Sequence, residues 1–414
     1  MKHLKNISFN IFCSFVLAFI IYFLFKNGII KDYIVGGPIK DFFIDLRIHY
    51  IPWFECYDLG LKGEYSQLCE AADYGGYGDV FFLIPFDQNL KLFYLNYLPY
   101  ITILLFIFTI TFLLNPKNKL EYLFVILAVL NPTTLLLMER LNFDIYIFLI
   151  LVIIALNRIY IFNWLLFIYI FFLKLMPILS GTFIFIENKK RSAFFLLTLV
   201  IFFVSLSLYY LFSDHSSLKY LQGGSFSGYW YIFGLNTIPK VFKYFGLNYI
   251  FCLVVVYLTF IYVLYRFYKS YEINNLIKNR DFFTFKWRLF LLGGNILLLC
   301  FLLVSNPAHR EVFLILLIPQ FLLLNNEKNK FLNLIIYFLI FRYLFLFIYG
   351  PANVINSTYY VDDVRYFSGV FLFATFAKGL LDFFLMSVIG AILIKMNFLI
   401  LKNFFNKLLI DFKF

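Results

Sequence analysis

Apolar stretches long enough to cross a lipid bilayer recur along the whole chain of 414 residues. About 20 apolar residues in a helix span the roughly 30 Å hydrocarbon core, where only helices and closed barrels satisfy their own backbone hydrogen bonds. Charged residues make up only 14% of the sequence, whereas an ordinary soluble protein is about a quarter charged. The sequence therefore predicts an all-α, polytopic integral membrane protein that forms a single domain over residues 1–414.

We expect about 11–12 transmembrane helices, including one segment that forms a broken, half-spanning hairpin. The predicted helices cover residues 8–30, 93–114, 120–138, 142–157, 160–187, 192–212, 248–268, 288–305, 311–325, 331–350 and 366–395. The segment 160–187 would be about 40 Å long as one helix, and Pro177 breaks it. Two short arms meeting near Lys174 would return the chain to the side it came from, and such breaks are tolerated where they line a cavity.

The distribution of positive charge orients these helices. Basic clusters occur at residues 116–119, 187–191, 266–288 and 325–330 and in the tail from Lys395, and the positive-inside tendency places them in the cytoplasm. The N-terminus is then inside. The loops predicted on the opposite side cover residues 31–92, 138–142, 213–247, 305–311 and 350–365. The net charge of +12 follows from this bias and does not require a nucleic-acid partner.

The long loop 31–92 concentrates acidic residues on the predicted extracytoplasmic side. Its carboxylates are Asp32, Asp41, Asp45, Glu55, Asp58, Glu64, Glu70, Asp73, Asp79 and Asp87. Cys56 and Cys69 lie in the same loop, where an oxidising environment allows a disulfide; two free thiols are the alternative. Four scattered histidines do not form a zinc pattern, so no metal site is expected.

Two polar elements interrupt the apolar sequence in its middle third. Arg140, Asn142 and Asp144 open a predicted helix, where Arg140 and Asp144 could form a local ion pair or the arginine could grip a phosphate. Lys174 lies in an apolar segment. An ionisable residue there is costly enough to suggest a function, although its side chain could also extend to the membrane interface.

Two further candidates lie later in the chain. His309 and Arg310 begin a predicted helix and could bind an anion or act as a simple polar cap. Trp230 lies in an aromatic and Gly-rich loop; its ring could belong to an interfacial aromatic belt or stack on a sugar.

Several cations that converge with a carboxylate on one membrane face suggest a lipid-linked phosphate substrate. The cations would stabilise the negative charge that develops on a departing lipid phosphate. A carboxylate would deprotonate the hydroxyl of the acceptor, and either Asp41 or Asp45 could supply it.

These elements, taken in order, resemble motifs of the GT-C superfamily of polytopic glycosyltransferases. Within it, they resemble the bacterial polyprenol-phosphate-mannose-dependent α-mannosyltransferase-like proteins. Asp45–Tyr50 resembles the family's Asp and Tyr after the first helix, and Arg140–Asp144 resembles its Arg-Gly-Asn-x-Asp element. Lys174–Pro177 resembles its Lys-x-x-Pro hairpin, and His309–Pro319 its histidine-containing helix start. Leu141 departs from the family's usual glycine.

The resemblance implies a hexosyltransferase in a bacterial cytoplasmic (inner) membrane. It would transfer mannose or another hexose from a polyprenyl-phosphate donor to a glycolipid or glycan acceptor on the extracytoplasmic face, with inversion. Asp45 would be the base, with Asp41 as the alternative. The donor phosphate would be held by Arg140, Lys174, His309 and Arg310, and the substrates would contact Asn142, Tyr50 and Trp230. No cofactor is expected, although the sequence is also compatible with a bound divalent cation.

Two other functions fit parts of the sequence. A transporter or flippase of lipid-linked saccharides would use the same cations without chemistry, but it should contain inverted repeats, which are not evident. A polymerase of the O-antigen type should have a large loop late in the chain, whereas the largest hydrophilic loop here follows the first helix.

Overall fold

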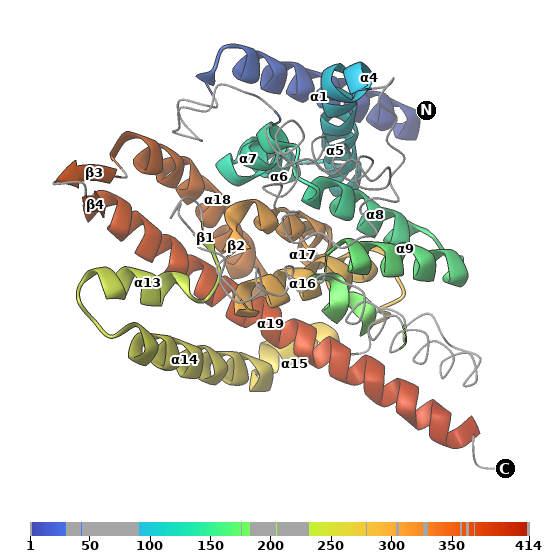
Figure 1. The fold of residues 1–414 in the computed structure, drawn as a ribbon. Coiled ribbons are helices and arrows are strands. Elements are labelled where there is room, and N and C mark those ends of the chain that lie inside the picture. The colour runs from blue at the N-terminus through green and yellow to red at the C-terminus, as the bar shows by residue number, and fades with distance from the viewer. Residues whose placement is uncertain are drawn as a thin grey trace, which may run out of the picture.

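The computed structural model describes residues 2–29, 43, 91–174, 176–182, 204, 232–278, 280–303, 306–325, 330–356, 358–361, 364–367 and 369–411. Helices dominate these residues, and the strands form two short antiparallel ribbons. The predicted helical class is therefore confirmed for the described part of the chain. In Figure 1, α1 (Lys2–Lys26) lies along one edge of the molecule and α14 (Tyr249–Lys269) along the opposite edge, with α16 (Phe285–Leu303) between them.

Several described helices are long and apolar enough to cross a membrane. Five pass on length and composition: Phe9–Lys26 in α1, Tyr249–Lys269 (α14), Phe285–Leu302 in α16, Lys330–Ile348 in α18 (Lys330–Asn356) and Gly369–Asn406 in α19 (Gly369–Asp411). A sixth span is formed if α6 (Lys119–Leu130) and α7 (Pro132–Arg140), which are bent by 46°, count as one. The shorter apolar helices are α5 (Leu98–Leu114), α8 (Asp144–Leu156) and α9 (Tyr160–Leu173). The prediction of a multi-pass membrane protein agrees with these helices. The predicted helix 192–212 lies outside the described residues except for Val204.

Asparagine and proline residues set several of the helix boundaries. Helix α5 ends at Asn115, whose φ of 40° is tolerated by asparagine better than by most residues. Helix α6 begins after Asn118, whose side chain accepts the backbone N–H of Glu121 at 3.0 Å. The α6–α7 bend falls at Asn131, which caps α7 by accepting the N–H of Thr134 at 3.0 Å, and Pro132 occupies the first helical position, where its missing N–H costs nothing.

The prediction of one continuous helix over residues 311–325 is wrong. The chain runs there as a 3₁₀-helix, η6 (Ala308–Leu316), and then as a short α-helix, α17 (Ile318–Asn325). Pro319 lies in the first turn of α17, where it favours a helix start and cannot extend a preceding helix. The break therefore falls just before this proline.

The predicted loops contain more regular structure than their sequences indicated. The additional helices are α13 (Thr237–Tyr244) and α15 (Tyr271–Ile277). The predicted helix 93–114 is divided at Tyr97 into α4 (Lys91–Asn96) and α5, and within the predicted segment 160–187 a 3₁₀-helix, η5 (Met176–Thr182), follows α9. The ribbons pair β1 (Ile232–Phe233) with β2 (Asn306–Pro307) and β3 (Thr358–Val361) with β4 (Val364–Phe367). Helix α18 extends to Asn356, and α19 continues through the predicted tail at Lys395 to Asp411.

Arg288, predicted at the end of a basic cytoplasmic loop, lies one turn inside α16 and is only 1% exposed. Its Nη2 donates to the carbonyl oxygens of Ile154 at 2.7 Å and Asn157 at 2.8 Å. These carbonyls lie at the C-terminal end of α8, where a cation is favourable. The charge therefore stabilises a helix end inside the protein.

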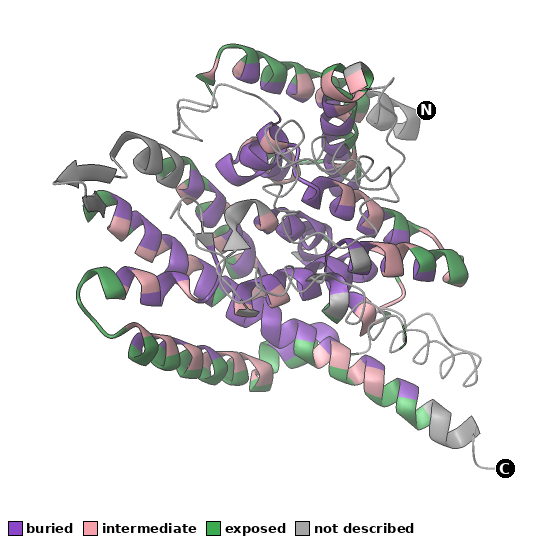
Figure 2. Cartoon of the chain, viewed as in Figure 1, coloured by how far each residue is buried: buried purple, intermediate pink, exposed green. Residues whose placement is uncertain are grey.

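The buried core lies around α16, α8 and η6, as Figure 2 shows by colour. Gly293 of α16 allows η6 to pack closely, because a Cβ atom there would lie 2.7 Å from Cβ of Leu316. The outer face of α14 instead exposes large apolar side chains, including Ile250 and Phe251. Such a face suits lipid better than water.

Candidate functional site

A buried polar cluster forms where α7 ends and α8 begins. Helix α7 ends at Leu141, which has φ 51° and ψ 47°, a left-handed conformation that glycine adopts more readily. Leu141 thus adopts a backbone conformation that glycine, the usual residue at this position of the family's motif, would also adopt. The side-chain oxygen of Asn142 then accepts the N–H of Asp144 at 3.1 Å, so Asp144 begins α8 with its carboxylate at the positive end of the helix dipole.

Lys174 provides the closest cation to this carboxylate. Helix α9 ends at Leu173, and Lys174 follows in an extended conformation with φ −150° and ψ 132°. Its Nζ lies 2.6 Å from Oδ1 of Asp144 and 3.5 Å from Oδ1 of Asn142. The helix does break close to Pro177, as predicted, and the chain continues as η5 to Thr182. Residues 183–187 of the predicted hairpin lie outside the described residues. The lysine is buried and pairs with an acid, so it does not simply extend to the interface.

Arg310 approaches the same carboxylate from η6. Its Nε lies 3.9 Å from Oδ2 of Asp144, which is close enough for electrostatic attraction but too long for a hydrogen bond. The arginine side chain is 21% exposed, whereas the aspartate is fully buried. Together Asn142, Asp144, Lys174 and Arg310 form the cluster that we call the Asp144 cluster. It carries one more positive than negative charge.

Arg140 does not form the predicted ion pair with Asp144. In the described part of the chain it has no ion pair, and its buried Nε has no hydrogen-bond partner. The left-handed Leu141 ends the helix between the two residues, so they do not have the i, i+4 helical geometry that the pair requires.

The long first loop returns to this site at Phe43. Its backbone N–H donates to the carbonyl oxygen of Glu139 at 2.8 Å, and its buried ring contacts Phe25 and Tyr100 at centroid distances of 6.5 and 5.5 Å. Phe43 therefore fixes one point of the loop against the end of α7. Asp41 and Asp45 stand two residues before and after it in the sequence.

A second loop reaches the site through the β1–β2 ribbon. Ile232 pairs with Pro307, and Phe233 pairs with Asn306, immediately before η6 carries Arg310. Trp230 stands two residues before β1 in the sequence. The structure thus brings the ends of two predicted extracytoplasmic loops to the same end of the helices.

Several predicted site residues lie outside the described part of the chain. They are Asp41, Asp45, Tyr50, Cys56, Cys69 and Trp230. The backbone of His309 belongs to η6. The predicted roles of these residues remain predictions.

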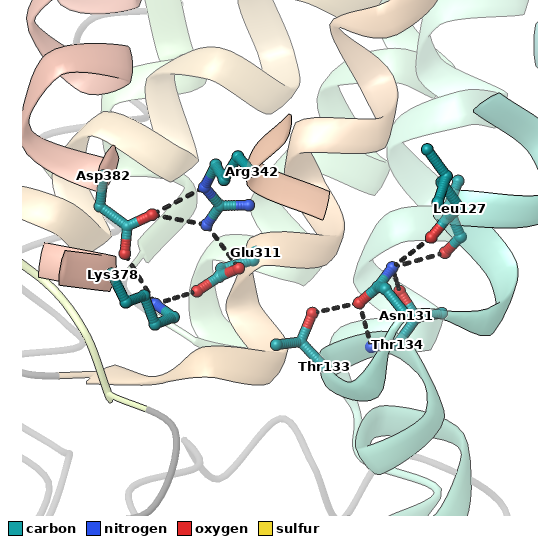
Figure 3. Close-up of polar contacts among 9 residues, drawn as sticks. Leu127, Asn131, Thr133, Thr134, Glu311, Arg342, Lys378 and Asp382 are labelled. Carbon is teal, nitrogen blue, oxygen red and sulfur yellow. Dashed lines mark hydrogen bonds and ion pairs between the residues drawn. The ribbon is translucent and has the colours of Figure 1, made fainter. Parts of the chain in front are cut away.

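A second buried cluster, which the sequence analysis missed, links three elements in the core. Arg342 Nη2 of α18 lies 2.5 Å from Oε2 of Glu311 and 2.6 Å from Oδ1 of Asp382. Lys378 Nζ of α19 lies 2.6 Å from Oε1 of Glu311 and 2.7 Å from Oδ2 of Asp382. Figure 3 shows these four side chains closing a ring, which we call the buried tetrad.

The tetrad is electrically balanced, with two cations and two carboxylates that are all nearly inaccessible to solvent. Balanced charges can be buried because each has an opposite partner within hydrogen-bond distance. Sequence did contain a signal for it: Arg342, Lys378 and Asp382 interrupt otherwise apolar helices, and ionisable residues in such helices usually face partners in the protein interior.

The two clusters meet at consecutive residues of η6. Arg310 faces Asp144, whereas Glu311 belongs to the tetrad. The tetrad therefore holds the backbone that carries Arg310. Within the described residues, no three His, Cys, Asp or Glu side chains gather as a metal-binding group.

The fold and these clusters define a helical protein with several helices of membrane-spanning length, a neutral ion network in its core and a positively charged cluster at the ends of its helices. Comparison of the chain with protein-family models, with curated proteins and with solved structures gives no match.

Proposed function

We propose that the protein is a membrane glycosyltransferase that moves a hexose from a polyprenyl-phosphate donor to a glycolipid or glycan acceptor. The proposal rests on the Asp144 cluster, where Lys174 and Arg310 converge on one buried carboxylate. The short Lys174–Asp144 contact of 2.6 Å holds the lysine in place. Arg310 makes no hydrogen bond to Asp144 at 3.9 Å, so its forked donors can turn toward a phosphate.

An apolar pocket beside the site suits the lipid part of such a donor. It has a volume of about 470 Å³ and lies between α1 and α5, where it is lined by Phe15, Phe19, Tyr22, Phe25, Tyr100 and Leu104 among others. Phe25 and Tyr100 also contact Phe43, which is bonded to the end of α7. An isoprenyl chain in this pocket would approach the charged cluster along the first-loop contact.

The base of the reaction would come from the first loop. Cα atoms two residues apart in a chain are separated by at most about 7 Å. The Cα atoms of Asp41 and Asp45 therefore each lie within that distance of the Cα atom of Phe43. The chosen carboxylate takes the proton of the acceptor hydroxyl, whose oxygen attacks the anomeric carbon. The bond from that carbon to the phosphate oxygen breaks, and its electron pair leaves with the phosphate, which the cations stabilise.

Sugar transfer by purified protein in lipid vesicles tests this proposal. Radiolabelled polyprenyl-phosphate sugars would be supplied with membrane-extract acceptors to wild type, Asp45→Asn and Asp41→Asn. Removal of the base is expected to lower the rate by about 10²–10⁴-fold while donor binding persists. Asp281→Asn, at an exposed position near the start of α16, is the matched control and should keep full activity.

A second pair of variants tests the phosphate site. Arg310→Gln should lower transfer by about 10²–10³-fold, as the loss of a group that stabilises departing charge does. Arg266→Gln, at an exposed position of α14, should leave it unchanged. Movement of donor lipid between leaflets without sugar transfer would contradict the enzyme and favour a flippase of lipid-linked saccharides.

A further inference from the structure

A separate pocket of about 420 Å³ lies between α1, α5, the start of α6, α16 and α17. Its polar lining residues are Asn10, Ser14, Thr111, Asn115, Lys117, Glu121 and Lys286. Its remaining lining is apolar and includes Phe108, Phe112 and Leu323. None of these residues belongs to the Asp144 cluster or the buried tetrad.

Helix lengths place this pocket at the opposite end of the molecule from the Asp144 cluster. On α5, Tyr100 contacts Phe43, whereas the pocket begins near Asn115; on α1, Phe25 contacts Phe43 and Asn10 lines the pocket. In both helices the separation of fifteen residues corresponds to about 22 Å. This distance is about three quarters of the roughly 30 Å thickness of the hydrocarbon core of a bilayer.

The charge of the pocket favours an anion. Lys117 and Lys286 line it together with a single carboxylate, that of Glu121. One oxygen of this carboxylate already accepts the backbone N–H of Lys117 at 2.6 Å, at the start of α6. In the part of the chain that the structure describes, neither lysine forms an ion pair. Among the described lining residues, the site therefore presents two ammonium groups and one negative charge.

The pocket also contains an acceptor without a donor. The side-chain amide of Asn10 donates to Oδ1 of Asn115 at 3.3 Å, but the buried Oδ1 of Asn10 has no hydrogen-bond partner among the residues that the structure describes. An unsatisfied buried acceptor is costly, and a hydroxyl group would satisfy it. A ligand that combines a phosphate with a hydroxyl fits these groups better than phosphate alone.

The apolar side of the pocket continues onto the outer surface. Phe108, Phe112 and Leu323 line it and are 42%, 51% and 44% exposed. Acyl chains could lie on these side chains while a headgroup occupies the polar part. Basic pockets between membrane helices at the level of the lipid headgroups are a recurring form of lipid recognition.

We propose that this pocket binds one anionic phospholipid of the surrounding membrane, of the phosphatidylglycerol class. Its phosphate lies between Lys117 and Lys286, and a headgroup hydroxyl donates to Asn10. The site is independent of sugar transfer. It ties α1, α5 and α16 together at the end remote from the Asp144 cluster.

Native mass spectrometry of the delipidated full-length protein in detergent tests this site. Phosphatidylglycerol and phosphatidylcholine with identical acyl chains would be titrated, and the bound lipid counted. Phosphatidylglycerol is expected to bind once per chain and about tenfold or more tightly, because two lysines act on its charge. Lys117→Gln/Lys286→Gln should reduce its binding to the level of phosphatidylcholine.

A matched variant separates this pocket from general surface charge. Lys119→Gln/Lys402→Gln removes two exposed lysines that do not line the pocket and should keep the preference. Asn10→Leu should remove the preference for phosphatidylglycerol over phosphatidic acid, which lacks the headgroup hydroxyl. The proposal is overturned if phosphatidylglycerol and phosphatidylcholine bind alike, or if inorganic phosphate displaces the bound lipid. It is also overturned if Lys117→Gln/Lys286→Gln leaves the lipid preference unchanged, or if the control variant loses as much of the preference as that variant does.

Discussion

At the residue scale, the main feature of this protein is that its buried charged side chains are paired with opposite charges. Asp144 is fully buried and lies against Lys174 and Arg310, and the four ions of the tetrad have no solvent to replace a lost partner. Removing one member of such a group leaves a buried charge uncompensated, which costs far more than the pair itself contributes.

The tetrad gives the sharpest test of this statement. Lys378→Met removes the partner of one oxygen each of Glu311 and Asp382, so we expect the free energy of unfolding to fall by about 3–5 kcal/mol. The double variant Lys378→Met/Glu311→Gln leaves Arg342 paired with Asp382 and should recover part of that loss. Denaturant unfolding in detergent, arranged as a double-mutant cycle, measures both effects.

Lys402→Met on the same helix supplies the control for this cycle. Lys402 is exposed, so its replacement should change stability by no more than about 0.5 kcal/mol. Equal effects of Lys378→Met and Lys402→Met would show that the tetrad does not depend on its charge balance.

At the element scale, sequence predicts well those helix boundaries that are set by the residues at the boundary itself. The asparagines and prolines around α5, α6 and α7 end or start helices through their own backbone preferences, and the break after α9 lies close to Pro177. The 3₁₀ form of η6 and the burial of Arg288 were missed because they depend on contacts with α16 and α8. Such partners are distant in sequence.

The two asparagine caps of α6 and α7 differ in burial and should differ in strength. Asn131 is 1% exposed and also donates to the carbonyls of Leu127 and Ala128, as Figure 3 shows in part. Asn118 is exposed and accepts only the N–H of Glu121. We expect Asn131→Ala to lower the free energy of unfolding by about 2–3 kcal/mol and Asn118→Ala by about 1 kcal/mol.

Thermal unfolding of the two asparagine variants in the same detergent would rank them. A loss at Asn118 equal to or larger than that at Asn131 would show that burial does not strengthen the second cap.

The contact of α16 with η6 should be sensitive to a single methyl group. In Gly293→Ala the new Cβ would lie 2.7 Å from Cβ of Leu316 and 3.0 Å from the carbonyl oxygen of Phe313, and overpacking of this kind costs about 1–3 kcal/mol. Gly369→Ala meets no atom within 4 Å and should be neutral. Thermal stability in detergent compares the two.

Because Arg310 lies on η6, Gly293→Ala should also weaken the binding of a polyprenyl-phosphate donor, whereas Gly369→Ala should not. Unchanged stability and donor binding in Gly293→Ala would mean that η6 can move away from α16 without consequence.

At the scale of the whole molecule, the two polar ends lie at opposite ends of α1 and α5, separated by about 22 Å along each helix, or about three quarters of the hydrocarbon core of a membrane. Composition was sufficient to predict helices and their approximate positions, since apolar length is a property of the sequence itself. The Asp144 cluster was predicted only in part: Lys174, Asn142 and Arg310 do meet, but Asp144 was considered only as one possible partner of Arg140. Sequence spacing cannot show which helix ends face each other.

The basic connectors predict an orientation of the molecule in the membrane, and this prediction can be measured. Lys119→Cys lies at the start of α6 and Lys91→Cys at the start of α4, and α5 runs between these two ends. In a background without the five native cysteines, a membrane-impermeant maleimide should label Lys91→Cys in intact cells. It should label Lys119→Cys only after the membrane is opened. The reverse pattern would place the Asp144 cluster in the cytoplasm and contradict a donor site on the outer face.

The 3₁₀ form of η6 sets a limit on how this chain can vary in length. Successive side chains of a 3₁₀-helix are rotated by about 120°, and Arg310 and Glu311 use two such neighbouring directions to reach different clusters. Loss of one residue before them would turn the acid toward Asp144 and take it away from the tetrad. Gain of one residue would instead turn the guanidinium toward the tetrad and away from Asp144. Loops elsewhere can absorb insertions and deletions, but in this segment a change of one residue brings a like charge to one buried site and withdraws a partner from the other.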